Sequence, residues 1–232
     1  MDRVLKKMME SDIFRDLPED VIRKELIPYA KVYQIPRGAP LIRFRQRCNE
    51  FGIVLKGRFV VQHMCQNSKS EIMNVLEAGD PFGLDLAFTD SRTAPFQVVT
   101  TQGSQVVSFP VHLILDPNAL METTRQQLLE NILLYLSNEN LLKEYRMAIL
   151  FQKSLRAKVM AYLTMESRQQ QTAAITIPFN RAEMASYLCI NRTCLSRELS
   201  LMQQEGIISF EHNTFTLLGD IRYQPVQICL ED

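Results

Sequence analysis

The sequence lacks the features that mark a membrane protein, a secreted protein or a strongly basic nucleic-acid binder. Its 232 residues carry 26 basic and 26 acidic side chains, so the formal net charge is +0 and any affinity for nucleic acid must come from local charge. No apolar run approaches membrane-spanning length. The opening residues, MDRVLKKMMESD, mix both charges without an apolar stretch, so we expect no secretion signal and no membrane partner.

Cysteine and histidine are too few and too scattered to predict a metal site. The cysteines, which form no CxxC pair and favour a reducing cytoplasm, are Cys48, Cys65, Cys189, Cys194 and Cys229. The only histidines are His63, His112 and His212. We therefore expect no cofactor and no enzyme, since a cupin-like enzyme, the remote alternative, would need clustered His and carboxylate ligands. A haem- or redox-based sensor stays open, with His63-Met64-Cys65 as ligands or Cys48 and Cys65 as a thiol pair.

Residues 180–218 have the pattern of two short helices followed by a hairpin. One helix opens after an asparagine N-cap, Asn180, and a second asparagine, Asn191, caps the next helix. The second helix has apolar residues at helical spacing and a terminating glycine: Leu195, Leu199, Met202 and Gly206. Residues 207–210 and 214–218 predict two strands joined by a polar turn. A helix-turn-helix with a hairpin is a DNA-reading arrangement.

The opposite face of the second helix carries basic and short polar side chains: Arg192, Thr193, Ser196 and Arg197. Arginine forks can meet guanine O6 and N7 or phosphate, and the short hydroxyl side chains between them allow close approach. Because this region has only a small excess of basic residues, two such modules on one palindrome would bind DNA better than one. The pattern alone is also compatible with a plain helical domain that has no ligand.

The segment RAEMASYLCINRTCLSRELSLMQQEGII resembles the winged helix-turn-helix of the Crp/Fnr family of bacterial transcription regulators. The family pattern R-x-E-x-A-x-x-L-x-x-x-R-x-x-x-S-R-x-L-x-x-[LM]-x-x-x-G-x-[IL] is matched by Arg181, Glu183, Ala185, Leu188, Arg192, Ser196, Arg197, Leu199, Met202, Gly206 and Ile208. The resemblance implies a DNA-binding set of Arg181, Asn191, Arg192, Thr193, Ser196 and Arg197. Many members carry Glu at the position of Thr193, so the operator sequence is not implied.

Residues 31–110 have a period of two, which predicts a β-rich domain. The strand-like segments are 32–35, 51–55, 58–61, 72–76, 97–100 and 105–109. Many short strands with glycine turns are typical of a sandwich or double-sheet jelly roll. Gly57 and the turn of residues 79–83 resemble the glycine skeleton of the cyclic-nucleotide-binding roll, which is the sensor domain upstream in Crp/Fnr regulators.

The resemblance also identifies the positions that would hold cyclic AMP, and here they are apolar. Members that bind it place Glu and Arg after the glycine turn and Thr-Ser on a long helix. This chain has Leu84, Ala94 and Leu141-Leu142 there, although Arg92 lies close enough for a loop shift to restore one contact. A buried phosphate without its charged partner is costly, so we predict a small, largely apolar or aromatic effector instead of cyclic AMP. The predicted pocket comprises Phe82, Leu84, Ala94, Phe96, Leu141, Leu142 and Tyr145.

Residues 118–151 return to a helical period and contain a heptad-like seam. Its members are Leu129, Leu133, Leu136, Asn140, Met147 and Leu150, with Lys143 as a second polar position. A dimer is favoured, because a palindromic operator needs two modules related by a two-fold axis. The alternative is a single amphipathic helix packed on its own roll.

Together these patterns predict an α+β protein. A sensor β-roll domain with N-terminal helices occupies residues 1–116, a long dimerisation helix and hinge occupy 117–151, and a winged helix-turn-helix domain occupies 152–232. We expect a cytoplasmic, homodimeric transcription regulator that binds palindromic double-stranded DNA. A small-molecule effector would shift the long helix and re-aim the DNA-binding helices, and an activator would also contact RNA polymerase.

Overall fold

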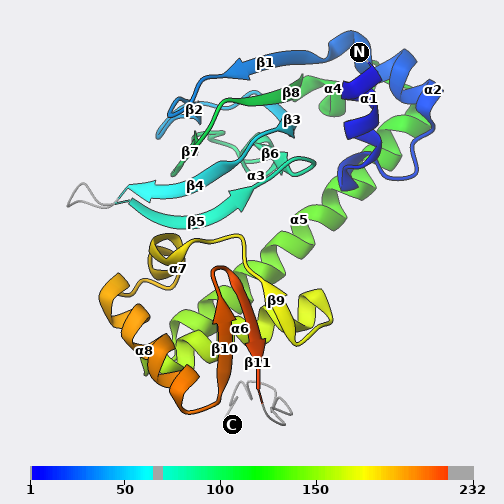
Figure 1. Ribbon diagram of the computed structural model, residues 1–232. Coiled ribbons are helices and arrows are strands. Elements are labelled where there is room, and N and C mark those ends of the chain that lie inside the picture. The colour runs from blue at the N-terminus through cyan, green and yellow to red at the C-terminus, as the bar shows by residue number, and fades with distance from the viewer. Residues whose placement is uncertain (1, 65–69, 219–232) are drawn as a thin grey trace, which may run out of the picture. The chain divides into compact units, whose positions relative to one another are not determined.

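The computed structural model describes residues 2–64 and 70–218, and the chain divides into two compact units, Met1–Leu141 and Leu142–Asp232 (Figure 1). Helix α5 (Glu122–Leu150) begins in the first unit and ends in the second. Cys65, Cys229 and the tail 219–232 lie outside the described residues. No helix in the described part of the chain is both long enough and apolar enough to cross a membrane.

Two four-stranded antiparallel sheets form the predicted roll of the first unit (Figure 1). One sheet has the order β1-β8-β3-β6, with strands Lys31–Ile35, Ser104–Pro110, Glu50–Lys56 and Pro81–Phe82. The other has the order β2-β7-β4-β5, with strands Pro40–Ile42, Gln97–Thr100, Phe59–Met64 and Ser70–Leu76. A buried apolar cluster takes side chains from both sheets, including Val54, Phe59, Leu76, Val98 and Val106. The double-sheet roll is therefore confirmed.

Glycines shape the turns of the roll for steric reasons. Gly57 has φ +105°, and a Cβ there would lie 2.0 Å from Ser104 Oγ. Gly83 has φ +78°, and a Cβ there would lie 2.8 Å from the Glu50 carbonyl oxygen. Only glycine adopts such angles without strain and leaves room for these neighbours. The short helix α3 (Leu84–Ala87) follows directly, whereas the sequence predicted only a turn at Pro81-Phe82, which instead forms β6.

Short helices complete the first unit at one end of the roll (Figure 1). They are α1 (Asp2–Met9), η1 (Asp12–Phe14), α2 (Glu19–Val21), η2 (Ile22–Leu26), η3 (Ile27–Tyr29) and α4 (His112–Leu115). Their apolar side chains share a buried cluster with β3, β8 and α5. In that cluster the rings of Phe14 and Phe109 meet edge to face at 5.6 Å between centroids, a favoured aromatic geometry.

Helix α5 buries one face of its first half and exposes apolar side chains elsewhere. Leu128 and Ile132 are buried against the first unit, and Asn131 Nδ2 donates to the carbonyls of Ile13 at 3.3 Å and Arg15 at 2.8 Å. The exposed large apolar residues are Leu129, Leu133, Leu134, Leu141, Leu142, Tyr145 and Met147. The helix begins at Glu122, later than the predicted residue 118.

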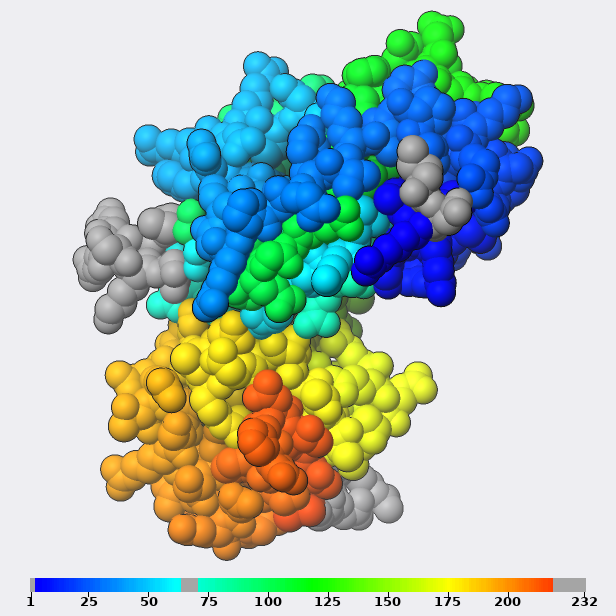
Figure 2. Space-filling model, turned by 45° about the horizontal axis from the view of Figure 1, so that its top comes forward, coloured from blue at the N-terminus to red at the C-terminus, as the bar shows by residue number. Residues whose placement is uncertain are grey.

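The second unit contains the predicted helix-turn-helix and wing. Its elements are α6 (Leu155–Gln170), β9 (Ala174–Thr176), α7 (Arg181–Tyr187), α8 (Arg192–Gln204), β10 (Ile208–Glu211) and β11 (Thr214–Leu217). The strands form one sheet of order β10-β11-β9, and the β10–β11 hairpin, the wing, lies at the surface of the unit (Figure 2). Tyr162, Phe179 and Tyr187 pack their rings together inside it.

Candidate nucleic-acid interface

Asparagine caps fix the start of both helices of the helix-turn-helix. Asn180 Oδ1 accepts from the backbone N–H groups of Ala182 and Glu183, and Glu183 Oε2 accepts from the N–H of Asn180 at 2.9 Å. This reciprocal capping box satisfies donors that a helix start otherwise leaves unpaired. Asn191 Oδ1 accepts from Thr193 N–H at 2.8 Å and caps α8 in the same way. Both predicted caps are confirmed.

The turn between α7 and α8 is tight. Cys189 has φ +54°, and the N–H of Ile190 donates to the carbonyl of Ala185 at 2.9 Å. At the other end of α8, Gly206 has φ +70° and terminates the helix as the sequence predicted. The length and ends of α8 are therefore set by local backbone chemistry, which places each of its side chains on a defined face.

Helix α8 separates its apolar and polar side chains onto opposite faces. Leu195, Leu199 and Met202 are fully buried in the unit. The residues predicted to contact DNA, Arg192, Thr193, Ser196 and Arg197, are all exposed. Two guanidinium forks and two hydroxyl groups thus share one accessible helix surface, which is the donor set that reads guanine edges and phosphates in a major groove.

Two other residues of the predicted DNA-binding set have partners inside the unit. Asn191 uses its side-chain oxygen as the cap of α8. The Arg181 guanidinium lies over the rings of Phe210 and Phe215, at 4.5 and 4.6 Å from their centroids. Burial lowers the pKa of Arg181, and its Nη1 has no hydrogen-bond partner among the described residues. Arg181 therefore joins the start of α7 to the wing.

An arginine on α6 binds one carboxylate of α8 and one at its C-terminal end, a contact that no sequence pattern predicted. Arg156 Nε donates to Glu198 Oε1 at 2.6 Å, and its Nη1 and Nη2 donate to the two oxygens of Glu205 at 2.6 and 3.0 Å. These bonds raise the pKa of Arg156 and lower that of Glu205. Because the planar fork engages both carboxylates at once, it fixes how α8 lies against α6.

A second arginine ties the end of α5 to α7. The Arg146 guanidinium lies 4.3 Å from the centroid of the Tyr187 ring, and Nη2 donates to the Tyr187 carbonyl at 3.2 Å. Between α5 and α6 the helical conformation is interrupted at Gln152-Lys153-Ser154, the predicted hinge. Ser154 Oγ accepts from Ala157 N–H at 3.0 Å. Contacts from both sides of this hinge thus reach the helix-turn-helix.

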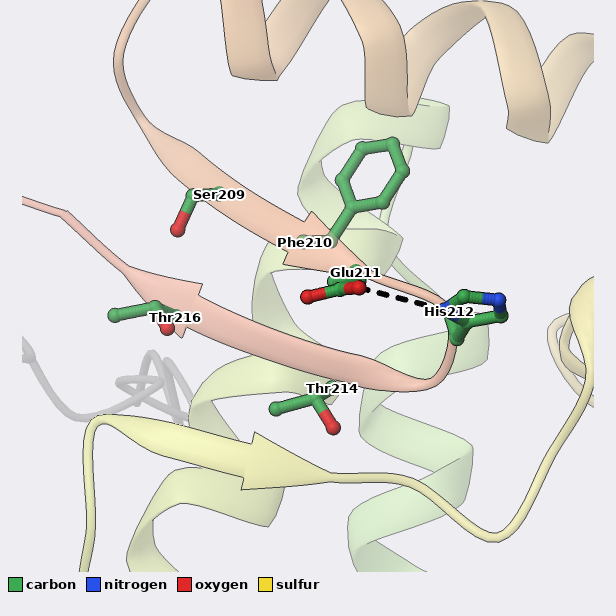
Figure 3. A pocket seen from close by; sticks show the side chains of 6 residues that line it. All are labelled: Ser209, Phe210, Glu211, His212, Thr214 and Thr216. Atoms are coloured by element: carbon green, nitrogen blue, oxygen red, sulfur yellow. Dashed lines mark ion pairs between the residues drawn. The ribbon is translucent and has the colours of Figure 1, made fainter.

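The wing carries a shallow hollow of about 560 Å³ (Figure 3). Its lining is mostly hydroxyl and polar side chains: Ser209, Phe210, Glu211, His212, Thr214 and Thr216. His212 and Glu211 are almost fully exposed at the tip, with 3.9 Å between Nδ1 and Oε1. Hydroxyl groups on an exposed hairpin are suited to phosphate oxygens, so the hollow is compatible with a DNA-facing wing.

The predicted effector residues fall into three places. Phe82 and Ala94 belong to the buried cluster between the two sheets, where Ala94 is fully buried, and the half-buried Phe96 packs against it. Leu84 belongs instead to the cluster that the N-terminal helices cover. The remaining three, Leu141, Leu142 and Tyr145, are exposed on α5. Arg92, which a loop shift could have brought to the phosphate position, has its Nη1 3.5 Å from Asn49 Oδ1.

The predicted seam on α5 is partly accessible. Leu129, Leu133 and Met147 are 36%, 68% and 43% exposed, and Asn140 between them is exposed as well. Leu136 is half-buried and packs against the cluster of the first unit, and Leu150 is half-buried. Leu136 therefore contributes to the roll's own packing.

The residues considered for metal or redox chemistry are dispersed. Cys48 is a buried thiol whose pKa burial raises, and His63, His112 and His212 are exposed. Cys65, the proposed partner of Cys48 and His63, lies outside the described residues. Within residues 2–64 and 70–218, no three or more His, Cys, Asp or Glu side chains gather where they could hold a metal ion.

Comparisons with known proteins agree with this architecture. The family model of the cyclic nucleotide-binding domain matches residues 32–116, and that of the Crp-like helix-turn-helix domain matches residues 157–219. A search of curated proteins found no match.

Solved structures of several regulators share the fold. CLP of Xanthomonas campestris has a TM-score of 0.66 at 15% identity, over 87% of this chain and all of that one. FixK2 from Bradyrhizobium japonicum has a TM-score of 0.62 at 15% identity, over 81% of this chain and 92% of that one. A CooA variant from Carboxydothermus hydrogenoformans has a TM-score of 0.59 at 16% identity, over 85% of this chain and 89% of that one.

A cyclic-nucleotide-binding-like roll followed by a winged helix-turn-helix defines the class of DNA-binding transcription regulators that have a sensor domain. The two family models together span more than half of the sequence, in the order that this class requires. The chain belongs to the Crp/Fnr family.

Proposed function

We propose that this protein is a cytoplasmic homodimer that reads palindromic DNA with α8 and responds to a small effector other than cyclic AMP. The observation that carries the proposal is the exposed face of α8, where Arg192, Thr193, Ser196 and Arg197 lie opposite a fully buried apolar face. This donor set is suited to base edges in the major groove. A regulator that activates transcription would also contact RNA polymerase.

Selection of bound duplexes from random DNA, with and without cell extract, tests the DNA-binding part. We expect an enriched inverted repeat whose half-sites are about 10 bp apart centre to centre, or a multiple of that, because two modules related by a two-fold axis meet successive major grooves. Binding should weaken steeply with salt. Enrichment of no sequence under either condition would contradict the proposal.

Dimerisation through α5 is supported by its exposed leucines. Leu129 and Leu133 are separated by one helical turn, and Met147 follows on the same face. Leu134 is 51% exposed but points about 100° away around the helix. Leu133 and Leu134 therefore make a matched pair of positions. Glutamate at either one removes exposed apolar surface, but only Leu133 lies in the seam.

Sedimentation at micromolar concentration is the measurement for the dimer. We expect Leu129→Glu with Leu133→Glu to give monomers, because four carboxylates would meet across the two-fold axis. Leu134→Glu, the control, should leave the dimer intact. We avoid Leu136, whose packing against the first unit would confuse assembly with folding. A parent protein that is already monomeric would refute the seam.

An effector other than cyclic AMP is supported by the interior of the roll. Ala94 and Leu84, at the positions of the phosphate-binding Arg and ribose-binding Glu of cyclic-AMP-binding members, are fully buried among apolar side chains. Phe82 and Phe96 add aromatic surface, which suits a small, largely apolar or aromatic ligand. CLP is described as responsive to c-di-GMP, so calorimetry should include both cyclic nucleotides. A micromolar heat with cyclic AMP would contradict the proposal.

A further inference from the structure

Three exposed arginines stand on one tight turn of the roll. Arg43, Arg45 and Arg47 lie between β2 and β3, and Phe44 among them is 42% exposed. The N–H of Gln46 donates to the Arg43 carbonyl at 3.0 Å, and the N–H of Arg43 donates to Gln46 Oε1 at 2.9 Å. Backbone and side-chain bonds therefore hold this arginine turn (residues 43–47) in one conformation.

A fourth arginine is brought alongside by the next loop of the same unit. Arg45 N–H donates to the Ala94 carbonyl at 2.8 Å, and Ala94 N–H donates to the Gln46 carbonyl at 2.9 Å. Beside them, Cys48 N–H donates to the Arg92 carbonyl at 2.8 Å. The arginine turn and the Arg92 loop are thus adjacent backbones, far apart in sequence, and together they carry four arginines.

The arginines of this cluster differ from other arginines of the unit in their ion pairing. In the described part of the chain, no ion pair joins Arg43, Arg45, Arg47 or Arg92 to a carboxylate. Three other arginines of the unit, on or next to its helices, do form ion pairs: Arg15 with Asp12, Arg23 with Glu19 and Arg125 with Glu122. Like charges on neighbouring residues repel one another, so we expect the arginine turn to lower stability in the absence of an anion.

Two of the four arginines also have backbone angles that arginine disfavours. Arg45 has φ +61° and Arg92 has φ +49°. Non-glycine residues with positive φ are uncommon, and those that occur are enriched in Asn, Asp and His. Such strain is concentrated at functional sites, where the side chain is needed despite the cost. Glycine or asparagine would suit both positions better if only the turn mattered.

We propose that the arginine turn, together with Arg92, is a binding site for a nucleotide that carries two or more phosphates. Guanidinium forks match phosphate oxygens in bidentate pairs. Three or four forks offer more hydrogen-bond donors than the two oxygens of one carboxylate can accept, so they suit a ligand with several phosphates. Phe44, whose ring centre lies 5.3 Å from the Arg45 guanidinium, offers an exposed aromatic face on which a base can stack. The side chains of the arginine turn are exposed and Arg92 is half-buried, so the site is additional to the buried positions discussed for the effector.

Replacement of Arg45 by glycine separates strain from function. We expect Arg45→Gly to raise the melting temperature of the ligand-free protein by about 2 °C or more, because glycine accepts the positive φ and one repelling charge is lost. The same variant should bind nucleotide more weakly. Opposite changes in stability and affinity are the signature of a strained binding residue. A variant that binds as tightly as the parent would overturn the proposal.

Calorimetry with a nucleoside triphosphate and with inorganic triphosphate at 0.15 M salt measures the site directly. We expect the double variant Arg43→Gln with Arg47→Gln to bind both ligands with at least about tenfold lower affinity, which corresponds to ~1.4 kcal/mol. The control, Arg15→Gln with Arg23→Gln, removes the same charge from ion-paired positions and should bind like the parent. No heat with either ligand at millimolar concentration, or equal weakening in the control, would overturn the proposal.

Phe44→Leu tests the aromatic part. This variant should bind the nucleoside triphosphate with lower affinity and inorganic triphosphate with unchanged affinity, since only the nucleotide has a base to stack. An equal effect on both ligands would contradict the stacking role and, with it, the assignment to a nucleotide.

Discussion

The two units of this protein place their polar chemistry in opposite ways. In the second unit, α8 turns its arginines and hydroxyl groups outward and buries only apolar side chains. In the first unit, the two positions that the sequence predicts to correspond to the Glu and Arg of cyclic-AMP-binding members, Leu84 and Ala94, are buried in apolar clusters. The comparison teaches that the two units place polar side chains differently: one exposes them on a helix surface, and the other has apolar side chains in the interior of the roll.

The sharpest way to break this comparison is to restore the missing charge inside the roll. Ala94→Arg places a guanidinium in a cluster with Phe82 and Leu86, where Ala94 is fully buried. An unpaired buried charge should cost about 3–5 kcal/mol of unfolding free energy, measured by denaturant titration, without producing cyclic-AMP binding. Ala78→Arg, on an exposed turn, is the control. A stable Ala94→Arg protein that binds cyclic AMP would mean that only one residue separates the two sensors.

The next largest effect concerns the DNA-reading surface. Arg197→Ala should cost about 1–3 kcal/mol of specific binding per half-site, because a fork-to-guanine pair is lost in each protomer. Arg192→Ala should cost less if that residue meets mainly phosphate, and the loss should then be similar for all sequences. Gln203→Ala, exposed further along α8, serves as the control. Operator affinity is measured by titration. If it is unchanged in a folded Arg197→Ala protein, α8 is excluded as the helix that reads DNA.

Much of the second unit could be predicted from sequence, because its signals are local. The caps Asn180 and Asn191 and the terminator Gly206 each act within one helical turn. The strands β2, β6 and β9 were missed because two or three residues cannot display a period of two.

Contacts between distant residues left no trace in the sequence pattern. The Arg156 pairs with Glu198 and Glu205 join positions 42 and 49 residues apart, and the position of Arg181 over Phe210 and Phe215 is equally non-local. The wing contact gives Arg181 a role that its place in the family motif did not suggest. Periodicity and capping describe how an element forms, and they carry no information on which distant charge it meets.

The Arg156 fork provides a smaller effect that sharpens the account of α8. Arg156→Lys keeps the charge but cannot bridge Glu198 and Glu205 with planar geometry. We expect a smaller loss of operator affinity than for Arg197→Ala, with an unchanged salt dependence because no phosphate contact is removed. Arg168→Lys, the same change at the other end of α6, is the control. Titration against operator and random duplexes should show that the ratio of operator affinity to random-duplex affinity falls. An unaltered ratio would mean that the Arg156 fork contributes only to packing and does not orient α8 for reading DNA.

The smallest effect concerns a half-buried carboxylate of the roll, Asp80. Burial raises the pKa of Asp80, although its Oδ2 accepts from Glu77 N–H at 2.7 Å. The folded state therefore holds this proton more tightly than the unfolded state, and stability from this group falls as pH rises from the unfolded value of 3.8 through the folded pKa. Asp80→Asn, which can still accept the same hydrogen bond, should be more stable than the parent at pH 7. The difference in unfolding free energy should shrink as pH approaches the unfolded value, whereas a difference that grows on acidification would mean that the Glu77 hydrogen bond outweighs burial.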